Sequence, residues 1–191
     1  MNEQLDAIQT ELRKELDDAR FQHTLGVMYT AASMAMCHGA DLEQALLAGL
    51  LHDCAKCIPS EEKIKMCQKQ DIPVTEVEYA NPGLLHAKLG AYLAEQKYHV
   101  ADSVILDAIR YHTTGRPAMT QMDKIIYIAD YMEPGRRELP NMNDVRYLAF
   151  HDLDACLYRI LHDSLEYLKS GNKPLDPLTE ETFQYYQSLQ K

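Results

Sequence analysis

Apolar residues recur every three or four positions along most of the chain, a spacing that places them on one face of an α-helix. In the first segment this stripe consists of Leu5, Ile8, Leu12 and Leu16. The helices that the spacing predicts span residues 3–19, 24–37, 42–58, 60–70, 82–98, 102–112, 121–132 and 143–169, with a short one after Thr179. Alternation with a period of two is confined to VTEVEYA (74–80), a short strand candidate. The pattern predicts an all-α fold.

Residues that favour helix ends stand beside several of these segments. Asp41 offers an N-cap for the helix predicted over 42–58, with Gln44 three residues later, as in a capping box. Pro59 ends this predicted helix. Asn81 followed by Pro82 is a second N-cap candidate. The sequence contains no internal repeat, low-complexity run or interdomain linker. We therefore expect one domain over residues 1–191, with a helical-bundle core at about 20–140 and the helices of 143–191 packed on it.

Composition narrows the class of protein. A chain of 191 residues with 46% apolar and 25% charged residues is typical of a soluble globular protein with one sizeable core. No apolar run approaches the roughly 20 residues that span a bilayer, and the polar N-terminal sequence lacks the features of a signal peptide. We expect a cytoplasmic protein without a membrane partner, whose five irregularly spaced cysteines stay reduced.

The net charge of −10 bears on the choice of ligand. A nucleic-acid groove needs clustered Lys and Arg, so we expect no nucleic-acid partner. A small phosphate ligand stays compatible with this charge where metal ions or local cations offset the repulsion.

Candidate chemistry begins in AGLLHDCAK (48–56), where His52 and Asp53 interrupt an apolar run that is predicted to be a buried helix. Burying unpaired ionisable groups is costly, so this pair requires partners. Further residues of this kind stand at helix ends or on apolar faces elsewhere: His23, His86, His112 and Asp130. In a helical bundle such side chains could converge, and mixed imidazole and carboxylate ligands suit iron, manganese or zinc.

Taken singly, each of these residues is more often a hydrogen-bonded core residue than a metal ligand. A second His-Asp dipeptide, His151-Asp152, has no matching helices around it and shows how often the pair arises by chance. By itself, the 48–56 stretch leaves open a satisfied core pair or an undefined metal site. No role is predicted for the histidines that lie among polar neighbours, which are His38, His99, His151 and His162.

Two further features have simpler explanations. Cys54 and Cys57 form a CxxC, but a zinc site needs a second pair and a thioredoxin-like motif needs a βαβ context. Asp123 lies seven residues before Asp130 on the same helix face, where it could support the site. We expect it instead to be a solvated or capping carboxylate.

The ordered set of His23, His52-Asp53, His86, His112 and Asp130 resembles the H…HD…H…H…D pattern of the HD-domain superfamily of metal-dependent phosphohydrolases, over about residues 20–140. Finer features are similar to the YqeK-type symmetrical bis(5′-nucleosyl)-tetraphosphatases over roughly 15–170: GLLHDCAK, NPGLLHAKLGAYLAE and AIRYHTTGRPAMTQMDKIIYIADYMEPGRR. One departure is RELPNM after Arg136, where the family commonly continues with an Asp-Phe-Pro-Gly-like stretch. This departure bears on contacts with the nucleotide more than on the reaction.

The resemblance implies a single-domain helical bundle of the HD type. It also implies an enzyme that cleaves diadenosine tetraphosphate symmetrically to two ADP, by attack of a metal-bound water on a phosphate. The expected cofactor is a divalent transition metal, iron first and manganese or zinc as alternatives, with one or two ions bound. The family tends to form dimers, so we expect a homodimer.

The resemblance assigns roles to individual residues. The metal ligands would be His23, His52, Asp53 and Asp130. Catalytic roles would belong to Asp53, Lys56, His86 and His112, the two histidines binding either phosphate oxygens or a second metal. The dinucleoside polyphosphate substrate would contact Lys56, His86, His112, Tyr131, Arg136 and Arg137.

Two alternative functions stay open at this point. One is an HD phosphohydrolase that acts on another nucleotide, such as a nucleoside monophosphate or a cyclic nucleotide. The other is a nucleotide-binding regulator without turnover, although binding alone would not require a complete set of metal ligands.

Overall fold

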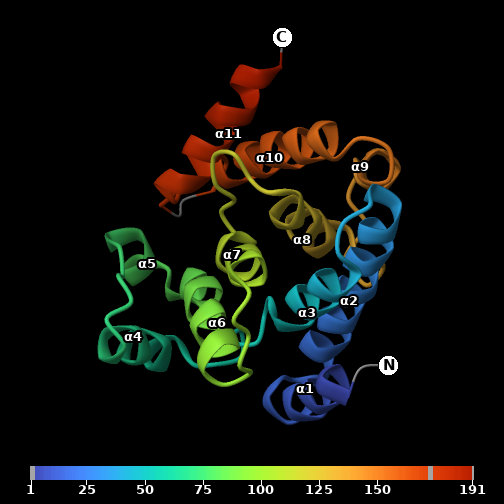
Figure 1. Ribbon diagram of the computed structural model, residues 1–191. Helices are drawn as coiled ribbons and strands as arrows, with labels where there is room; N and C mark the ends of the chain where they lie inside the picture. Colours follow the sequence, from blue (N-terminus) through green and yellow to red (C-terminus); the bar gives the residue numbers. More distant parts are fainter. Residues whose placement is uncertain (1–2, 172–173, 191) are drawn as a thin grey trace.

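A computed structural model describes residues 3–171 and 174–190, and within these ranges the chain forms helices and no strand. The elements, in chain order, are α1 (Glu3–Glu15), α2 (Asp18–His38), α3 (Leu42–Leu51), α4 (Ser60–Lys69), α5 (Glu76–Ala80), the short 3₁₀ helix η1 (Pro82–Leu84), α6 (Leu85–Gln96), α7 (Ser103–Tyr111), α8 (Gln121–Met132), α9 (Met142–Ala149), α10 (Leu153–Lys169) and α11 (Pro177–Leu189). The predicted all-α fold class is confirmed (Figure 1).

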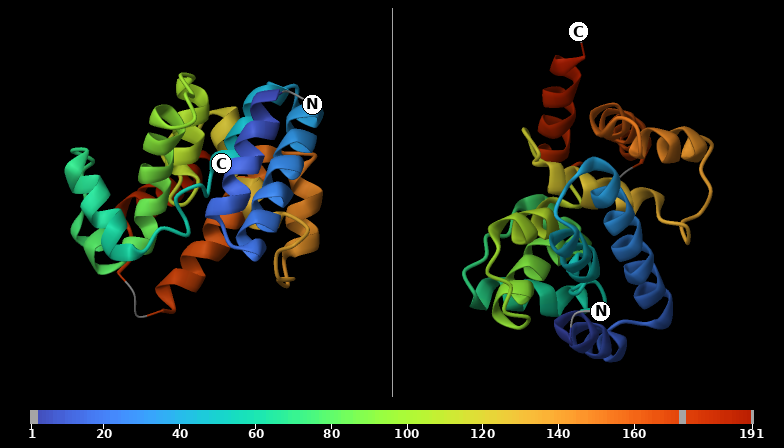
Figure 2. Two further views of the ribbon diagram at one scale, coloured as in Figure 1. Left: turned by 90° about the horizontal axis from the view of Figure 1, so that it is seen from below. Right: turned by 45° about the vertical axis from the view of Figure 1, so that its right-hand side comes forward.

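Helix α8 occupies the centre of the molecule (Figure 1) and packs against α2, α3, α7, α9 and α10. Helix α6 packs on α7, and α4 packs on α6 at the periphery. Helices α10 and α11 pack together, and Figure 2 shows the end of α11 extending away from the bundle. Among the described residues, no helix combines the length and the apolar character needed to cross a membrane. The core therefore forms where α2, α3, α7 and α8 meet.

Close contact between α2 and α3 depends on Gly49. A Cβ at this position would lie 2.8 Å from the Met28 Cα, a backbone atom that cannot move aside without displacing α2. The missing side chain lets the two helix backbones touch. His23 on α2 and His52 at the end of α3 are thereby brought near each other.

The prediction for residues 121–132 agrees with α8 at both ends. Thr120 and Asp123 form a capping box at its N-terminus, so the expected capping role of Asp123 is confirmed. Asp123 is buried rather than solvated, and Arg116 donates to its Oδ2 from Nε at 2.9 Å and from Nη2 at 2.8 Å. This carboxylate supports the helix and not the metal cluster described below.

The prediction of one helix over 42–58 is wrong beyond Leu51. His52 and Asp53 lie in a run of turns after α3, in which backbone N–H groups donate to carbonyls three residues back, as from Lys56 to Asp53 at 2.9 Å. The His52 imidazole donates to the Gly49 carbonyl at 2.7 Å. Apolar spacing continues through this segment because its side chains are still buried, although the backbone is no longer α-helical.

Other boundaries also differ from the predictions, each for a local reason. The strand candidate 74–80 contains α5 instead, because Thr75 and Glu78 form a capping box. Residues 143–169 form two helices rather than one, since the Asp152 side chain accepts from the backbone of α10 and starts a new helix there. Asp17 likewise separates the first two helices and caps α2. Helix α2 therefore begins at Asp18, six residues before the predicted start at Thr24. Asn81 stands at the N-cap position of η1 with Pro82 at the first helical position, as predicted, although its side chain makes no cap hydrogen bond.

Candidate metal centre

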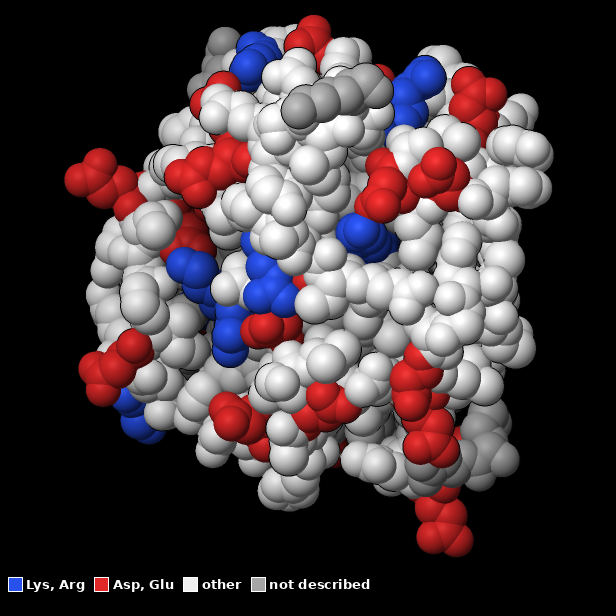
Figure 3. All heavy atoms as spheres, turned by 45° about the horizontal axis from the view of Figure 1, so that its top comes forward, with Lys and Arg blue, Asp and Glu red and all other residues white. Residues whose placement is uncertain are grey.

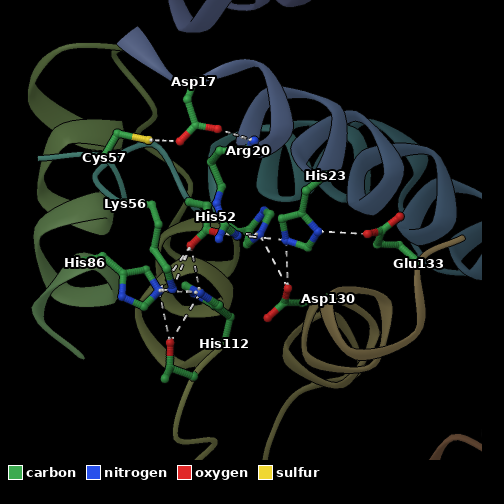
Figure 4. A network of polar contacts seen from close by, with 12 residues as sticks. Asp17, Arg20, His23, His52, Lys56, Cys57, His86, His112, Asp130 and Glu133 are labelled. Atoms are coloured by element: carbon green, nitrogen blue, oxygen red, sulfur yellow. Dashed lines mark hydrogen bonds and ion pairs between the residues drawn. The ribbon is translucent and has the colours of Figure 1, made fainter. Parts of the chain in front are cut away.

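Helices far apart in the sequence bring six ionisable side chains into one cluster, which Figure 4 shows from close by. His23 comes from α2, His52 and Asp53 follow α3, and Asp130 lies on α8. His86 lies in the first turn of α6, and His112 ends α7. All residues that the sequence pattern predicted for the site are therefore brought together. Their roles as ligands stay a prediction.

Two overlapping triads within the cluster could each hold a metal ion. The first consists of His23, His52 and Asp130, and the second of His52, Asp53 and His112. In each triad the ligand atoms lie within 4.8 Å of one another. The His23 Nε2 lies 3.0 Å from the Asp130 Oδ1, and the His52 Nε2 lies 3.8 Å from the same oxygen.

Asp53 lies between the two halves of the cluster. Its Oδ2 is 3.8 Å from the His23 Nε2 and 3.5 Å from the His52 Nε2. Its Oδ1 is 3.1 Å from the His86 Nε2 and 3.6 Å from the His112 Nε2. A carboxylate placed in this way can ligate one ion or bridge two.

Three of the histidines are oriented by the backbone. The Nδ1 atoms of His52, His86 and His112 lie 2.7, 2.5 and 2.7 Å from the carbonyl oxygens of the residues three positions earlier. Donation from Nδ1 leaves the Nε2 lone pair free in a neutral imidazole, which is the form that binds metals. Because all three rings turn Nε2 inward, their lone pairs point into the same space.

Several of these inward-facing atoms have no hydrogen-bond partner within the described part of the chain. The buried atoms concerned are His23 Nε2, His52 Nε2 and Asp53 Oδ1. An unsatisfied buried acceptor costs about 1–3 kcal/mol, so native structures rarely leave several together. Divalent cations bound at the two triads would satisfy these atoms, and imidazole nitrogens with carboxylate oxygens are the donors that zinc and iron accept. The donor set therefore fits a divalent transition metal.

The charge states of the cluster agree with metal binding. Burial by itself raises the pKa of Asp53, but the electrostatic effect of His52 and of the other imidazoles around the carboxylate outweighs it and holds the pKa well below its usual value. The pKa of Asp130 is also lowered, because the nearby His23 imidazole and the positive charges around the carboxylate overcome burial. Burial lowers the pKa of His86 from 6.5 to about 4, against the opposing effect of Asp53. At neutral pH the cluster thus presents ionised carboxylates beside the neutral His86.

Sequence reasoning missed Glu133, which orients His23. This residue caps the C-terminus of α8, is 3% exposed, and its Oε1 lies 2.9 Å from the His23 Nδ1. Its Oε2 accepts from the Gly135 N–H at 2.5 Å. A Cβ at Gly26 would lie 2.4 Å from the same Oε2, so glycine is needed there to admit the carboxylate. Partners of this kind hold a ligand histidine in one tautomer and raise its basicity.

We expect Glu133→Gln to weaken metal binding by roughly 10- to 100-fold, because the amide cannot hold His23 as the charged carboxylate does. The measurement is titration of the metal-free protein with Co²⁺ or Zn²⁺ against a competing chelator. Glu138→Gln is the matched control, since Glu138 is 68% exposed and pairs with Arg146 instead. Wild-type affinity in Glu133→Gln, or a loss matched by Glu138→Gln, would show that the carboxylate does not act on the metal.

Arg20 is a second residue that sequence reasoning missed. It lies three residues before His23 on α2, and its Nη1 lies 2.6 Å from the Asp53 Oδ2. The guanidinium is partly exposed, whereas Asp53 is buried. The spacing of three residues from His23, which places both on one helix face, is the signal that could have identified it.

A cavity of about 890 Å³ opens from the cluster. Its walls include the four predicted substrate-binding residues outside the histidines, namely Lys56, Tyr131, Arg136 and Arg137. The Lys56 Nζ is 3.1 Å from the His86 Nε2 and 3.7 Å from the Asp53 Oδ1. On the face shown in Figure 3, acidic side chains are scattered while a group of basic ones lies left of the centre. Because Lys56, Arg136 and Arg137 line the cavity, positive charge is available there despite the net charge of −10.

Arg136 is tied to the cluster by Asp130. Its Nη2 pairs with the Asp130 carboxylate, and its Nε donates to the Asp130 carbonyl at 2.7 Å. Asp130, Glu133 and Arg136 belong to one short segment at the end of α8, so a single turn positions a candidate ligand, the partner of His23 and a cation.

The CxxC cysteines lie outside this chemistry. Cys54 is buried, and burial raises the pKa of its thiol to about 12, so it stays protonated. Cys57 is exposed and contacts the Asp17 carboxylate at 3.5 Å. Within the described residues the cysteines are free.

A search with protein-family models finds the HD domain over residues 20–135, more than half of the chain. The chain belongs to the HD-domain family. The matched region contains every candidate ligand of the cluster and ends before α9. The HD domain of this chain thus coincides with the part that builds the metal centre.

Similar proteins extend the match beyond the HD domain. A Bacillus subtilis (strain 168) protein named "Bis(5'-nucleosyl)-tetraphosphatase, symmetrical" is 41% identical over 174 residues, covering 91% of this chain and 92% of its own. A Halalkalibacterium halodurans protein of the same name is 36% identical, covering 90% and 91%. A crystal structure from Clostridium acetobutylicum, described as that of a "predicted HD superfamily hydrolase involved in NAD metabolism", has a TM-score of 0.92 at 37% identity, and the match covers 97% of both chains.

Proposed function

We propose that this protein is a metal-dependent hydrolase that cleaves diadenosine tetraphosphate symmetrically into two ADP. The observation that carries the proposal is the similarity over nine-tenths of both chains to proteins named symmetrical bis(5′-nucleosyl)-tetraphosphatases. The buried cluster of inward-facing His and Asp atoms in the HD domain supports it, because a metal held there would activate water for attack on a phosphorus. We also propose one domain with its core at about 20–140, a homodimer and a cytoplasmic location.

His23, His52, Asp53 and Asp130 would hold the main metal, for which we propose iron, with manganese or zinc as alternatives. A metal bound there would supply a Lewis acid that lowers the pKa of water toward neutrality. The second triad, which includes His112, supports binding of another ion or of phosphate oxygens. His86 faces the same space, since its Nε2 lies 3.0 Å from the His112 Nε2.

Four residues that line the cavity, Lys56, Tyr131, Arg136 and Arg137, act on the substrate. Symmetric cleavage adds the oxygen of water to one of the two central phosphorus atoms, and the bridging oxygen leaves with the other ADP. Charge grows on the equatorial and leaving oxygens during this step. Lys56 and Arg136 stabilise this charge by donating to those oxygens, while Tyr131 and Arg137 line the same cavity and contact the substrate.

Identification of the products tests the reaction. Incubation of the metal-loaded protein with diadenosine tetraphosphate is expected to yield ADP alone, as separated by anion-exchange chromatography. Equimolar AMP and ATP would contradict symmetric cleavage. Turnover of a nucleoside monophosphate or a cyclic nucleotide without turnover of the dinucleotide would instead identify an HD phosphohydrolase of different specificity. Tight nucleotide binding with no turnover of any nucleotide would indicate a regulator.

A further inference from the structure

The cavity at the metal centre continues well beyond the HD domain. Its inner end is lined by His86 and His112, and its outer part by α10 and by the segment that leads into α11. These outer elements lie after residue 135, where the HD match ends. The C-terminal helices therefore build one wall of the same cavity.

The outer wall differs in polarity from the inner end. Lys56, Arg136 and Asp130 make the inner region highly charged. Tyr167, Leu168 and Leu175 add aromatic and aliphatic surface to the outer wall, beside polar residues of the same elements: Arg159, Asp163, Ser164 and Asp176. Tyr167 is 78% exposed and Leu168 is 41% exposed. Large apolar side chains left open beside a binding cavity are typical of ligand contacts.

A rigid polar group stands at the edge of this wall. Asp163 on α10 lines the cavity, and its Oδ2 accepts from the Asn141 Nδ2 at 2.6 Å and from the Arg159 Nε at 2.7 Å, while its Oδ1 lies 3.0 Å from the His162 Nδ1 and keeps a further lone pair. Asn141 is buried and also donates to the Tyr131 hydroxyl at 3.2 Å. These bonds hold the carboxylate in place, where it can accept from a hydroxyl or an amino group of a ligand.

We propose that Tyr167, Leu168 and Leu175, together with Asp163, form the subsite for one nucleoside of the dinucleotide substrate. The order of chemistry along the cavity matches that of a nucleotide, with anionic phosphates at the cations and metal centre and a neutral base at the apolar wall. The Tyr167 ring stacks on the base, and Asp163 accepts from the ribose or an exocyclic amino group. This inference rests on the proposed function, because it assumes a nucleotide substrate.

Two parts of the chain would then bind different parts of the substrate. The HD domain binds and cleaves the phosphate chain, whereas α10 and the start of α11 recognise the nucleoside. An HD domain with other helices at this position would present the same phosphate chemistry to a different substrate.

Tyr147→Ala is a matched control for Tyr167→Ala. Tyr147 on α9 is 63% exposed, but its ring stacks on His151 at 3.9 Å between centroids and does not line the cavity. Both substitutions remove one exposed tyrosine from a C-terminal helix. If removal of an exposed tyrosine only lowers the stability of the folded protein, both variants should show the effect. Loss of a ligand contact should appear in Tyr167→Ala alone.

The experiment measures binding of ADP and of inorganic pyrophosphate to the metal-loaded protein by titration calorimetry. Tyr167→Ala is expected to weaken ADP binding by about 5- to 100-fold, the range for loss of one base–aromatic stack, without changing pyrophosphate affinity. Tyr167→Phe and Tyr147→Ala should retain the ADP affinity. For diadenosine tetraphosphate, Tyr167→Ala should raise KM while kcat stays within about twofold of wild type.

Unchanged ADP affinity in Tyr167→Ala would overturn the subsite, as would equal weakening of ADP and pyrophosphate. Failure of the proposed function is distinguishable from this result. If wild-type protein does not cleave the dinucleotide, the comparison of ADP with pyrophosphate still reports whether the wall binds a nucleoside.

Discussion

His52→Ala and Asp53→Ala are each expected to lower the rate of diadenosine tetraphosphate hydrolysis by about 10³-fold or more, because a bound metal supplies several kcal/mol of transition-state stabilisation. His52 belongs to both triads, and Asp53 contacts histidines on both sides of the cluster. Removing either side chain disrupts both candidate ion positions. The measurements are the initial rate of ADP release and the metal content of the purified variants.

The chain contains its own control for this prediction. His151 also precedes an aspartate, but it is exposed and its Nδ1 contacts the Tyr147 carbonyl at 2.7 Å, far from the cluster. His151→Ala should keep wild-type activity and metal content. Undiminished hydrolysis in His52→Ala or Asp53→Ala would exclude the proposed centre. Treatment of wild-type protein with a chelator should abolish activity, and readdition of the metal should restore it.

Lys56→Met is expected to lower kcat by about 10²-fold, the usual cost of removing one donor aimed at developing charge. The Lys56 Nζ reaches the cavity beside His86 and Asp53, where it can donate to a phosphate oxygen. Methionine keeps an unbranched side chain of nearly the same length and removes the charge. Steady-state kinetics at saturating substrate measures the effect, and metal analysis shows whether the centre stays loaded.

Lys65→Met serves as the control, because Lys65 is an exposed residue of α4 and does not line the cavity. Lys56→Arg should recover part of kcat, since a guanidinium still donates to phosphate although with a different shape. A loss of kcat in Lys56→Met that is matched by an equal loss of bound metal would place the effect of Lys56 on the centre rather than on the substrate.

The sequence predicted most of the helices because apolar spacing is a local property. Helix α8 agrees at both ends with the predicted 121–132, where a capping box and the Glu133-Pro134-Gly135 stop coincide with the apolar pattern. The prediction was wrong where apolar side chains stay buried although the backbone is no longer one continuous α-helix. Residues 52–58 keep helical spacing of apolar side chains while the backbone turns, and Asp152 divides 143–169 without interrupting the apolar stripe.

The sequence by itself also determined which residues are candidates for the metal centre. The H…HD…H…H…D order of six ionisable residues is visible in the sequence, because the order of residues along the chain does not depend on how the helices pack. Their convergence, and the inward direction of each Nε2, required the structure.

Only the tertiary structure decided which other residues support the site. Glu133 acts on a histidine 110 positions away, through space that Gly26 leaves open on a neighbouring helix. Arg20 contacts Asp53 across 33 positions, and Tyr167 reaches the cavity from a helix outside the HD match. Such contacts depend on how helices pack, which local periodicity does not encode. The sequence thus determined most of the helices and the candidate ligands. The packing of the helices determined which residues contact those ligands and which side chains form the outer wall of the cavity.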